Sequence, residues 1–390
     1  MVNVTGYAYP WDVNDDPGAA AQAAELGVDF VALAANYHAA RLVTPLHPTR
    51  RSLDVPHSAM YAPIRHKAWQ DRRLVPRAPT WLEKDDWFND AARRLSAEGL
   101  SVLAWMPITH EDDLGAQHPD LAVRNAFDDI YPYALCPSSD EVRMYCRTLV
   151  EEVLHTTDSA GVVLEACGPF GVEHGSVHDK SEMAGLNETQ SILLSVCFCV
   201  ACLHALDGFG LDADALADAV RTALSGPVSS LGEALGEDFA AQLAQFRAGL
   251  SSTLRHELVE SARSVRPDAT VTVHASVSPW ATGSFSALGD SSDVAELKAV
   301  VANCWNATTA EQELEGMGKL LGDQSTLGAF VRADRVTGSP EEFVERFRRL
   351  GMSELHLYHL GLFNRESLEV ARELVSACHA AGDAPAAYDR

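Results

Sequence analysis

The amino-acid sequence predicts an α/β fold, a (β/α)8 TIM barrel with a helical insertion after the fourth strand. Short apolar runs alternate with amphipathic helical patterns along all 390 residues, beginning with a strand. Repeated βα units imply a parallel sheet, and eight such units with insertions fit a chain of this length. An open doubly wound sheet is the alternative. It has little support, because residues 5–9 stand where a dinucleotide-binding fold carries Gly-x-Gly-x-x-Gly.

Start and stop residues delimit the elements. The first helix begins at an Asp, has Pro17 in its first turn and stops before Gly27. The nearly continuous apolar run after it predicts a strand buried on both faces of a parallel sheet. Gly99 and Gly351 end two later helices. The expected strands are residues 2–9, 28–35, 100–105, 161–165, 269–275, 298–303, 326–332 and 353–358. The expected helices outside the insertion are residues 16–26, 85–98, 140–156, 309–321, 340–350 and 365–381.

Two long segments interrupt the alternation, and we treat residues 1–390 as one domain. Residues 39–80 contain six prolines. We expect them to form an ordered loop over the barrel mouth, because aromatic side chains such as Trp69 argue against disorder. Residues 186–269 are helical and poor in strands, so we interpret them as an insertion that includes the crossover helix. If the chain forms a homo-oligomer, we expect the interface within residues 205–265.

The composition excludes several classes of protein. The formal net charge is −25, and a surface this acidic repels nucleic acid and anionic lipid, which favours a neutral or cationic ligand. No window approaches the roughly 18 apolar residues of a transmembrane helix, and the first residues show no signal-peptide pattern. Eight cysteines in 390 residues favour a reduced chain with a metal site over a disulfide framework. We therefore expect a cytoplasmic protein without nucleic-acid or membrane partners and without an organic cofactor.

Polar and aromatic side chains follow the ends of the predicted strands. In a barrel, the chemistry lies at the C-terminal ends of the strands. Aromatic faces stack on the C–H faces of sugars, and planar polar groups bond the hydroxyls, so this set indicates a small carbohydrate substrate. The substrate-binding candidates are Tyr9, Trp11, Asn36, His38, Trp105, His110, His174, His274, Trp280, Asn303, Trp305, Arg332, His356 and Tyr358.

Glycoside hydrolysis needs two carboxyl groups beside the scissile bond. Glu165 ends an apolar strand, where burial would raise its pKa, and we predict that it is the acid/base. Asp334, just past the seventh strand, is the first candidate for its partner. Glu173 is the second candidate, and its alternative role is to bind substrate together with His174.

A Cys-x-Cys-x-x-Cys triplet at Cys197, Cys199 and Cys202 can place three thiolates around one tetrahedral zinc ion. A closed site with four thiolates would be structural, because it leaves no open position for chemistry. The alternative interpretation is that the three cysteines are buried small hydrophobic residues. The candidates for a fourth ligand are Cys136, Cys146 and Cys167.

The residues around this triplet resemble glycoside hydrolase family 42, the barrel β-galactosidases. That family has a Cys-x-Cys-x-x-Cys segment after its strand-4 acid, and its fourth zinc-binding Cys precedes a Ser-rich turn and a helix with a Tyr-Arg pair. This chain is similar in Cys136-Pro137-Ser138-Ser139 and in the helix with Arg143 and Tyr145. The resemblance implies that Glu165 is the acid/base. It also implies that a structural zinc is held by Cys136, Cys197, Cys199 and Cys202.

The chain also departs from that family at three places. Leu164 precedes the acid, where the family has Asn. Residues 331–334 contain no Glu, although the family has its nucleophile at the end of strand 7. The gap between the acid and the triplet is longer and contains residues 173–180. The resemblance therefore implies a divergent relative of the glycoside hydrolase barrels.

Two other classes of function remain open. One is a metal-dependent lyase, isomerase or hydrolase with histidine ligands on several strand ends, although no His-x-His or His-Glu-x-x-His spacing is present. Its candidate ligands are His38, His110, His174, His178, His274, His356 and His359. The other is a carbohydrate-binding barrel without catalytic activity, which the missing strand-7 Glu suggests.

Overall fold

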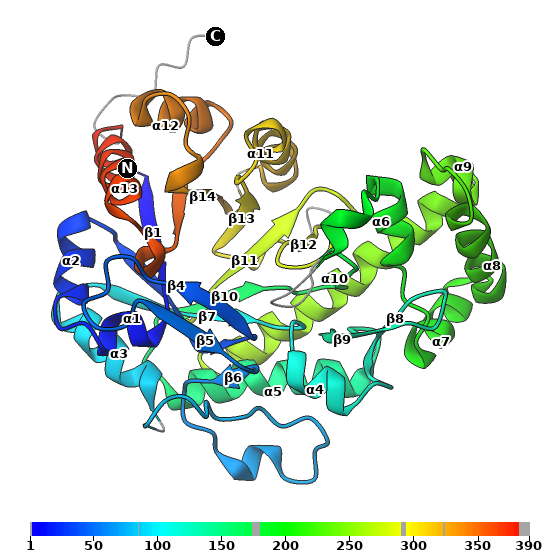
Figure 1. Ribbon diagram of the computed structural model, residues 1–390, viewed down its shortest axis with the longest axis horizontal. Helices are drawn as coiled ribbons and strands as arrows, with labels where there is room; N and C mark the ends of the chain where they lie inside the picture. The colour runs from blue at the N-terminus through cyan, green and yellow to red at the C-terminus, as the bar shows by residue number, and fades with distance from the viewer. Residues whose placement is uncertain (1, 85, 174–179, 290–293, 323, 382–390) are drawn as a thin grey trace.

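The computed structural model describes residues 2–84, 86–173, 180–289, 294–322 and 324–381. Its centre is a closed barrel of eight parallel strands (Figure 1). The strands pair in the order β10-β7-β2-β1-β15-β14-β13-β11, and β10 pairs with β11 to close the ring. The predicted (β/α)8 TIM barrel is confirmed. The strands are β1 (Asn3–Ala8), β2 (Phe30–Ala34), β7 (Ser101–Pro107), β10 (Gly161–Glu165), β11 (Thr270–Ser276), β13 (Ala299–Asn303), β14 (Thr326–Arg332) and β15 (Glu354–Tyr358).

Helices surround the barrel, as the βα pattern predicts (Figure 1). Local caps define them: the Ser139 side chain accepts a hydrogen bond from Val142 N at the start of α5, and Gly27, with φ of +88°, ends α2. One short helix, α1, was not expected. It begins at Pro10, whose fixed φ suits a first helical position. The outer helices are α1 (Pro10–Asn14), α2 (Ala19–Leu26), α3 (Trp87–Ala97), α5 (Asp140–Thr156), α11 (Ala307–Leu321), α12 (Pro340–Arg349) and α13 (Arg365–Ala380).

The segment of residues 39–80 packs as short paired elements after β2. Trp69 is buried against Tyr145 of α5, with ring centroids 5.6 Å apart. Arg65 donates two hydrogen bonds to the buried carboxylate of Glu152, also on α5, at 2.8 and 2.5 Å. The elements are β3 (Asn36–Tyr37) paired with β6 (Ala59–Met60), β4 (Ala40–Val43) paired with β5 (Ser52–Val55), and the 3-10 helix η1 (His66–Trp69).

The loop after β7 contains more structure than the sequence indicates. It forms α4 (Asp112–Gln117) and an irregular antiparallel hairpin of β8 (Ala122–Arg124) and β9 (Ile130–Leu135). These elements are too short to show a clear periodicity. Tertiary contacts stabilise the hairpin: the Tyr131 hydroxyl donates a 2.8 Å hydrogen bond to the Leu194 carbonyl of the insertion.

The predicted helical insertion follows β10 and is confirmed. It has its own apolar cluster, which includes Leu206, Leu216 and Leu243. Figure 1 shows its helices as a lobe at the right of the barrel, from which the long α10 leads back to β11. None of the described helices is long and apolar enough to cross a membrane. The helices are α6 (Glu188–Leu194), α7 (Val200–Phe209), α8 (Ala213–Leu224), α9 (Leu231–Leu235) and α10 (Glu237–Val265). Short elements also follow several barrel strands: η2 (Ser181–Ala184), β12 (Ser286–Ala287), η4 (Ala333–Arg335) and η5 (Leu360–Leu362).

Candidate active site and metal cluster

Glu165 is the last residue of β10, and its side chain is almost completely buried. The Trp105 Nε1 group donates a 2.7 Å hydrogen bond to its Oε2. Burial raises the pKa of Glu165 to about 7, against the opposing effect of hydrogen bonds from Ser284 and Trp105. His274 Nδ1 lies 3.7 Å from Oε2, but burial lowers the pKa of His274 well below its ordinary value. That contact is therefore not an ion pair near neutral pH, and the Glu165 carboxyl group can either donate or accept a proton there.

The residue after the acid has an unusual backbone. Ala166 has φ of +58°, a left-handed conformation that costs a non-glycine residue about 1–3 kcal/mol. Three hydrogen bonds hold it. Ala166 N donates to the Ser284 carbonyl at 3.0 Å, and its own carbonyl accepts from Thr109 N at 3.2 Å and from Thr109 Oγ1 at 2.8 Å. The strained turn fixes the position of Glu165 at the end of its strand.

A chain of buried polar side chains lies inside the barrel. The Tyr7 hydroxyl is 2.7 Å from His274 Nε2 and 3.1 Å from His356 Nδ1. His356 Nε2 is in turn 3.3 Å from Glu354 Oε2. All four side chains are buried. The two histidines were candidates for substrate binding, and the structure places them in the barrel interior.

Aromatic rings fill the mouth over β1 and β15. Tyr9 stacks on Trp11 with centroids 4.7 Å apart and lies 4.2 Å from the ring of His359. Trp105 packs edge-on against Tyr358 at 6.3 Å. Tyr9, Trp11 and Trp105 have no measurable exposure. These three predicted substrate-binding residues therefore pack against other protein groups, and Tyr358 remains partly exposed at their edge.

The open part of the mouth is a cleft of about 340 Å³ over β11 and β13. Two further carboxylates, Glu188 of α6 and Glu313 of α11, border it. His174 and His178 lie outside the described residues. Four of the predicted candidates line the cleft: Glu173, Trp280, Asn303 and Trp305.

Glu313 was not indicated by the sequence. Its carboxylate accepts hydrogen bonds from Ser276 Oγ at 2.9 Å and from Val277 N at 3.1 Å, both at the end of β11. Two donors on another element thus hold it at the cleft. No motif surrounds Glu313 in the sequence, and the packing of α11 against β13 and β14 brings it to the end of β11.

Three other predicted site residues, Arg332, Asp334 and Asn36, form hydrogen bonds with neighbouring protein groups. Arg332 donates to Asp334 at 3.0 and 2.6 Å, and this bonding lowers the pKa of Asp334. The Arg332 guanidinium also lies 5.3 Å from the ring centroid of Trp305. Asn36 directs its side-chain amide to the Pro107 carbonyl at 2.8 Å. Because its pKa is lowered, Asp334 is ionised, but it is not one of the residues that border the cleft.

Two histidines and an aspartate meet beyond the ends of β2 and β7. The rings of His38 and His110 stack with centroids 3.8 Å apart, and ligand atoms of these two residues and Asp112 lie within 4.8 Å of one another. His38 Nδ1 is 2.8 Å from the Ala39 carbonyl, and Ala39 N donates to Asp112 Oδ2 at 2.7 Å. Burial lowers the pKa of His38 to about 4, although its bond to Ala39 opposes this change. A neutral imidazole is the form that binds metals.

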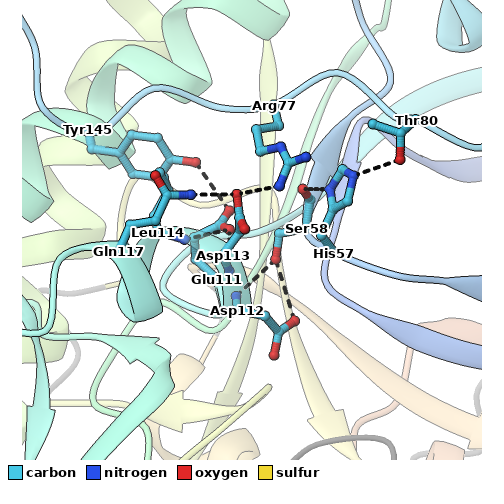
Figure 2. A network of polar contacts seen from close by, with 10 residues as sticks. All are labelled: His57, Ser58, Arg77, Thr80, Glu111, Asp112, Asp113, Leu114, Gln117 and Tyr145. Carbon is cyan, nitrogen blue, oxygen red and sulfur yellow. Dashed lines mark hydrogen bonds and ion pairs between the residues drawn. The ribbon is translucent and has the colours of Figure 1, made fainter.

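Polar contacts tie the 39–80 segment to α4 (Figure 2). Asp112 N donates to Ser58 Oγ at 3.0 Å, and Arg77 Nη1 lies 2.9 Å from Asp113 Oδ2. Glu111 caps the helix by accepting a hydrogen bond from Asp113 N at 3.2 Å. Burial raises the pKa of Glu111 to about 7. These bonds fix Asp112 in position beside the two histidines.

Four cysteine side chains cluster between the hairpin and the insertion: Cys136, Cys197, Cys199 and Cys202. Cys136 Sγ is 3.4 Å from Cys202 Sγ and 3.8 Å from Cys197 Sγ. Around a tetrahedral zinc with Zn–S bonds of about 2.3 Å, neighbouring sulfurs are about 3.8 Å apart. The four thiols therefore fit one metal ion. Cys146 and Cys167 are buried outside this cluster.

The fold belongs to a class of barrels that includes many glycoside hydrolases. The sequence matches no protein-family model and no curated protein. Among solved structures, α-L-fucosidase isoenzyme 2 from Paenibacillus thiaminolyticus has a TM-score of 0.58 at 11% identity, over 98% of this chain and 50% of that chain. The PgaB (BpsB) glycoside hydrolase domain from Bordetella bronchiseptica has a TM-score of 0.58 at 13% identity, over 96% and 99%. A GH42 β-galactosidase from G. stearothermophilus has a TM-score of 0.56 at 12% identity, over 98% and 57%. At these identities the likeness establishes the fold alone.

Proposed function

We propose that this chain is a glycosidase that cleaves a small carbohydrate in the cleft over β11 and β13. The observation that carries the proposal is Glu165, a buried carboxyl group at the end of β10 whose pKa is raised to about 7. Ser284, which bonds this carboxyl group, is followed by Phe285, a residue of the cleft wall. Glu165 does not itself border the cleft, and the Ser284–Phe285 segment connects its carboxyl group to the cleft wall.

In this mechanism Glu165 donates its proton to the glycosidic oxygen as the C–O bond breaks. A second carboxylate either attacks the anomeric carbon or removes a proton from an attacking water. Glu313 is favoured for that role, because it lines the cleft and two donors hold it. Glu173 also lines the cleft. Asp334 is kept ionised by Arg332, as a base or nucleophile requires, and is the remaining candidate.

The cleft offers groups suited to a sugar. Trp280 and Trp305 present indole surfaces on which the C–H face of a sugar ring can stack. Asn303 and the serine hydroxyls beside it offer hydrogen bonds to sugar hydroxyls.

Leaving-group chemistry tests the role of Glu165. We would first screen aryl glycosides with the wild type and then compare it with Glu165→Gln. A substrate whose phenol leaves readily needs little protonation, so the variant should keep much more activity on it than on an alkyl glycoside. Equal losses on both substrates would argue against Glu165 as the acid. Glu111→Gln is the matched control, because Glu111 is also buried with a raised pKa but serves to cap α4.

We also propose that the four-cysteine cluster holds one structural zinc. All four ligands come from the chain, so the site has no open position, and its role is to join the segment after β9 to the start of α7. Elemental analysis of the purified chain should give one zinc. Cys199→Ser should lose it, and His274→Asn should keep it. A wild-type chain without bound metal under reducing conditions would contradict the assignment.

The convergence of His38, His110 and Asp112 favours a second candidate function, metal-dependent catalysis. Metal-dependent catalysis ranks below the glycosidase function, because the stacked rings of His38 and His110 would have to tilt apart before both could ligate one ion. Cobalt substitution distinguishes the two sites, since thiolate ligation gives an intense charge-transfer band that histidine and carboxylate ligation lacks. A second cobalt that tracks activity and is lost in Asp112→Asn would support this candidate. If the chain binds sugars but turns over none of them, it is a carbohydrate-binding barrel.

A further inference from the structure

Arg247 of α10 is a buried cation with few partners. The residue is 4% exposed. Among the residues that the structure describes, no carboxylate forms an ion pair with it, and its Nε has no hydrogen-bond acceptor. Nη1 donates to the Ser195 carbonyl at 3.4 Å, and Nη2 donates to the Trp280 carbonyl at 3.5 Å. Burial lowers the pKa of Arg247 to about 10, so it remains charged at neutral pH.

A buried guanidinium with only two long hydrogen bonds carries a large desolvation penalty unless an opposite charge lies nearby. Another arginine of this region follows the usual pattern: Arg143 pairs with Glu257 and Asp140. Arg247 instead borders a small cavity whose wall also includes Cys136, Cys197 and Cys202. Among the residues of this cavity wall, the cysteines are the ones that can acquire negative charge.

A divalent ion bound by four thiolates carries a formal charge of −2. We propose that Arg247 is the counter-charge of the metal-loaded cysteine cluster, and that it links this cluster to the wall of the cleft. The inference rests on the proposed metal site. Arg247 is a positioning residue in this scheme and contacts neither substrate nor metal.

The contacts of Arg247 show how it links the cysteine cluster to the cleft wall. Both of its acceptors, Ser195 and Trp280, border the cleft. Ser195 also lies two residues before Cys197 in the chain. The guanidinium is 5.9 Å from the ring centroid of Trp280. If the metal leaves, the cation loses its counter-charge, and the segments that carry these two cleft residues should loosen.

Metal affinity tests the counter-charge directly. Zinc would be titrated against a chromophoric chelator with the wild type, Arg247→Met and Arg247→Lys. Removing a group outside the ligand shell typically weakens metal binding about 10–100-fold, and we expect this for Arg247→Met. Arg247→Lys keeps the charge and should lose less. The control is Arg221→Met, since Arg221 lies in the same insertion, donates to the Ala126 carbonyl and pairs with Asp218. It should bind zinc as the wild type does.

Each outcome decides one point. If Arg247→Met folds and binds zinc as tightly as the wild type, the counter-charge role is wrong. If Arg247→Met does not fold, Arg247→Lys and Arg247→Gln replace it, because they differ in charge at similar length, and equal zinc affinity overturns the role. A wild type that binds no zinc overturns the metal site itself. Hydrogen exchange tests the link: removing zinc should increase exchange in residues 191–196 and 278–285 of the wild type, and unchanged exchange there would overturn it.

Discussion

The two sides of the barrel mouth use the same residue types in opposite ways. Over β1 and β15, Tyr9 and Trp11 are completely buried, and Trp11 packs against Tyr61 of the 39–80 segment at 5.3 Å. Over β11 and β13, Trp280 and Trp305 are partly exposed and border the cleft. The first side is covered by the segment that follows β2, and the second side faces the insertion. What covers a strand end, rather than the residue type found there, decides whether an aromatic ring is free to meet a ligand.

The largest expected effect concerns the acid that serves the open side. General acid catalysis typically contributes about 10²–10⁴-fold to the rate, so Glu165→Gln should lose about that factor in kcat/KM on glycosides with poor leaving groups. Steady-state kinetics on matched aryl and alkyl glycosides measures this loss. A loss below about tenfold on both substrates would move the acid role to another carboxyl group, with Glu313 the first to test.

The sequence indicated Glu165 and the cysteine cluster because each has a local signal. An apolar run that ends on a carboxylate marks a buried strand end, and a Cys-x-Cys-x-x-Cys spacing places thiolates together. Glu313 and Arg247 have no such signal, since each is an ordinary helical residue until tertiary packing brings it to the cleft or to the cysteines. The sequence predicted a loop of residues 39–80 over the mouth, but it did not indicate which rings this segment buries, because that depends on how the segment packs over β1.

A pair of tryptophan substitutions tests whether the packed and the open side of the barrel mouth differ in this way. Trp11→Ala on the packed side should lower the free energy of unfolding by about 3–5 kcal/mol, the usual cost of removing a large core side chain. Trp280→Ala on the open side should cost less than about 1 kcal/mol and weaken sugar binding about tenfold. Denaturant unfolding and ligand titration measure the two effects. Similar losses of stability in both variants would mean that the two sides do not differ in this way.

The dependence of stability on pH follows from the raised pKa of Glu165. Its pKa in the folded chain is about 7, against an ordinary value of 4.5. The folded chain therefore binds this proton more tightly than the unfolded chain does, and the contribution of Glu165 to stability is full below about pH 4.5 and is lost as the pH rises through 7. The shift corresponds to about 3 kcal/mol at most.

Denaturant unfolding at a series of pH values checks this expectation. The stability of the wild type relative to Glu165→Gln should fall between pH 4.5 and 7. Asp12 and Glu111 have pKa values raised in the same direction, but they remain in both proteins, so their effects cancel in the difference. A difference that stays constant over this range would show that Glu165 titrates normally.

The smallest expected effect concerns Tyr7, which connects the two sides beneath the mouth. Tyr7 belongs to β1, and its hydroxyl bonds His274 of β11 and His356 of β15. Tyr7→Phe keeps the ring but leaves two buried histidines without this partner, so it should cost about 1–3 kcal/mol of unfolding free energy. Tyr145→Phe is the control, because among the described residues that buried hydroxyl makes one long contact, of 3.5 Å, with Glu111, and it should cost less. Equal losses would mean that the polar chain through the barrel adds nothing beyond ordinary packing. A larger loss in Tyr7→Phe would mean that the hydroxyl helps to hold the β11 side, and with it the position of Glu165, against the packed side of the barrel.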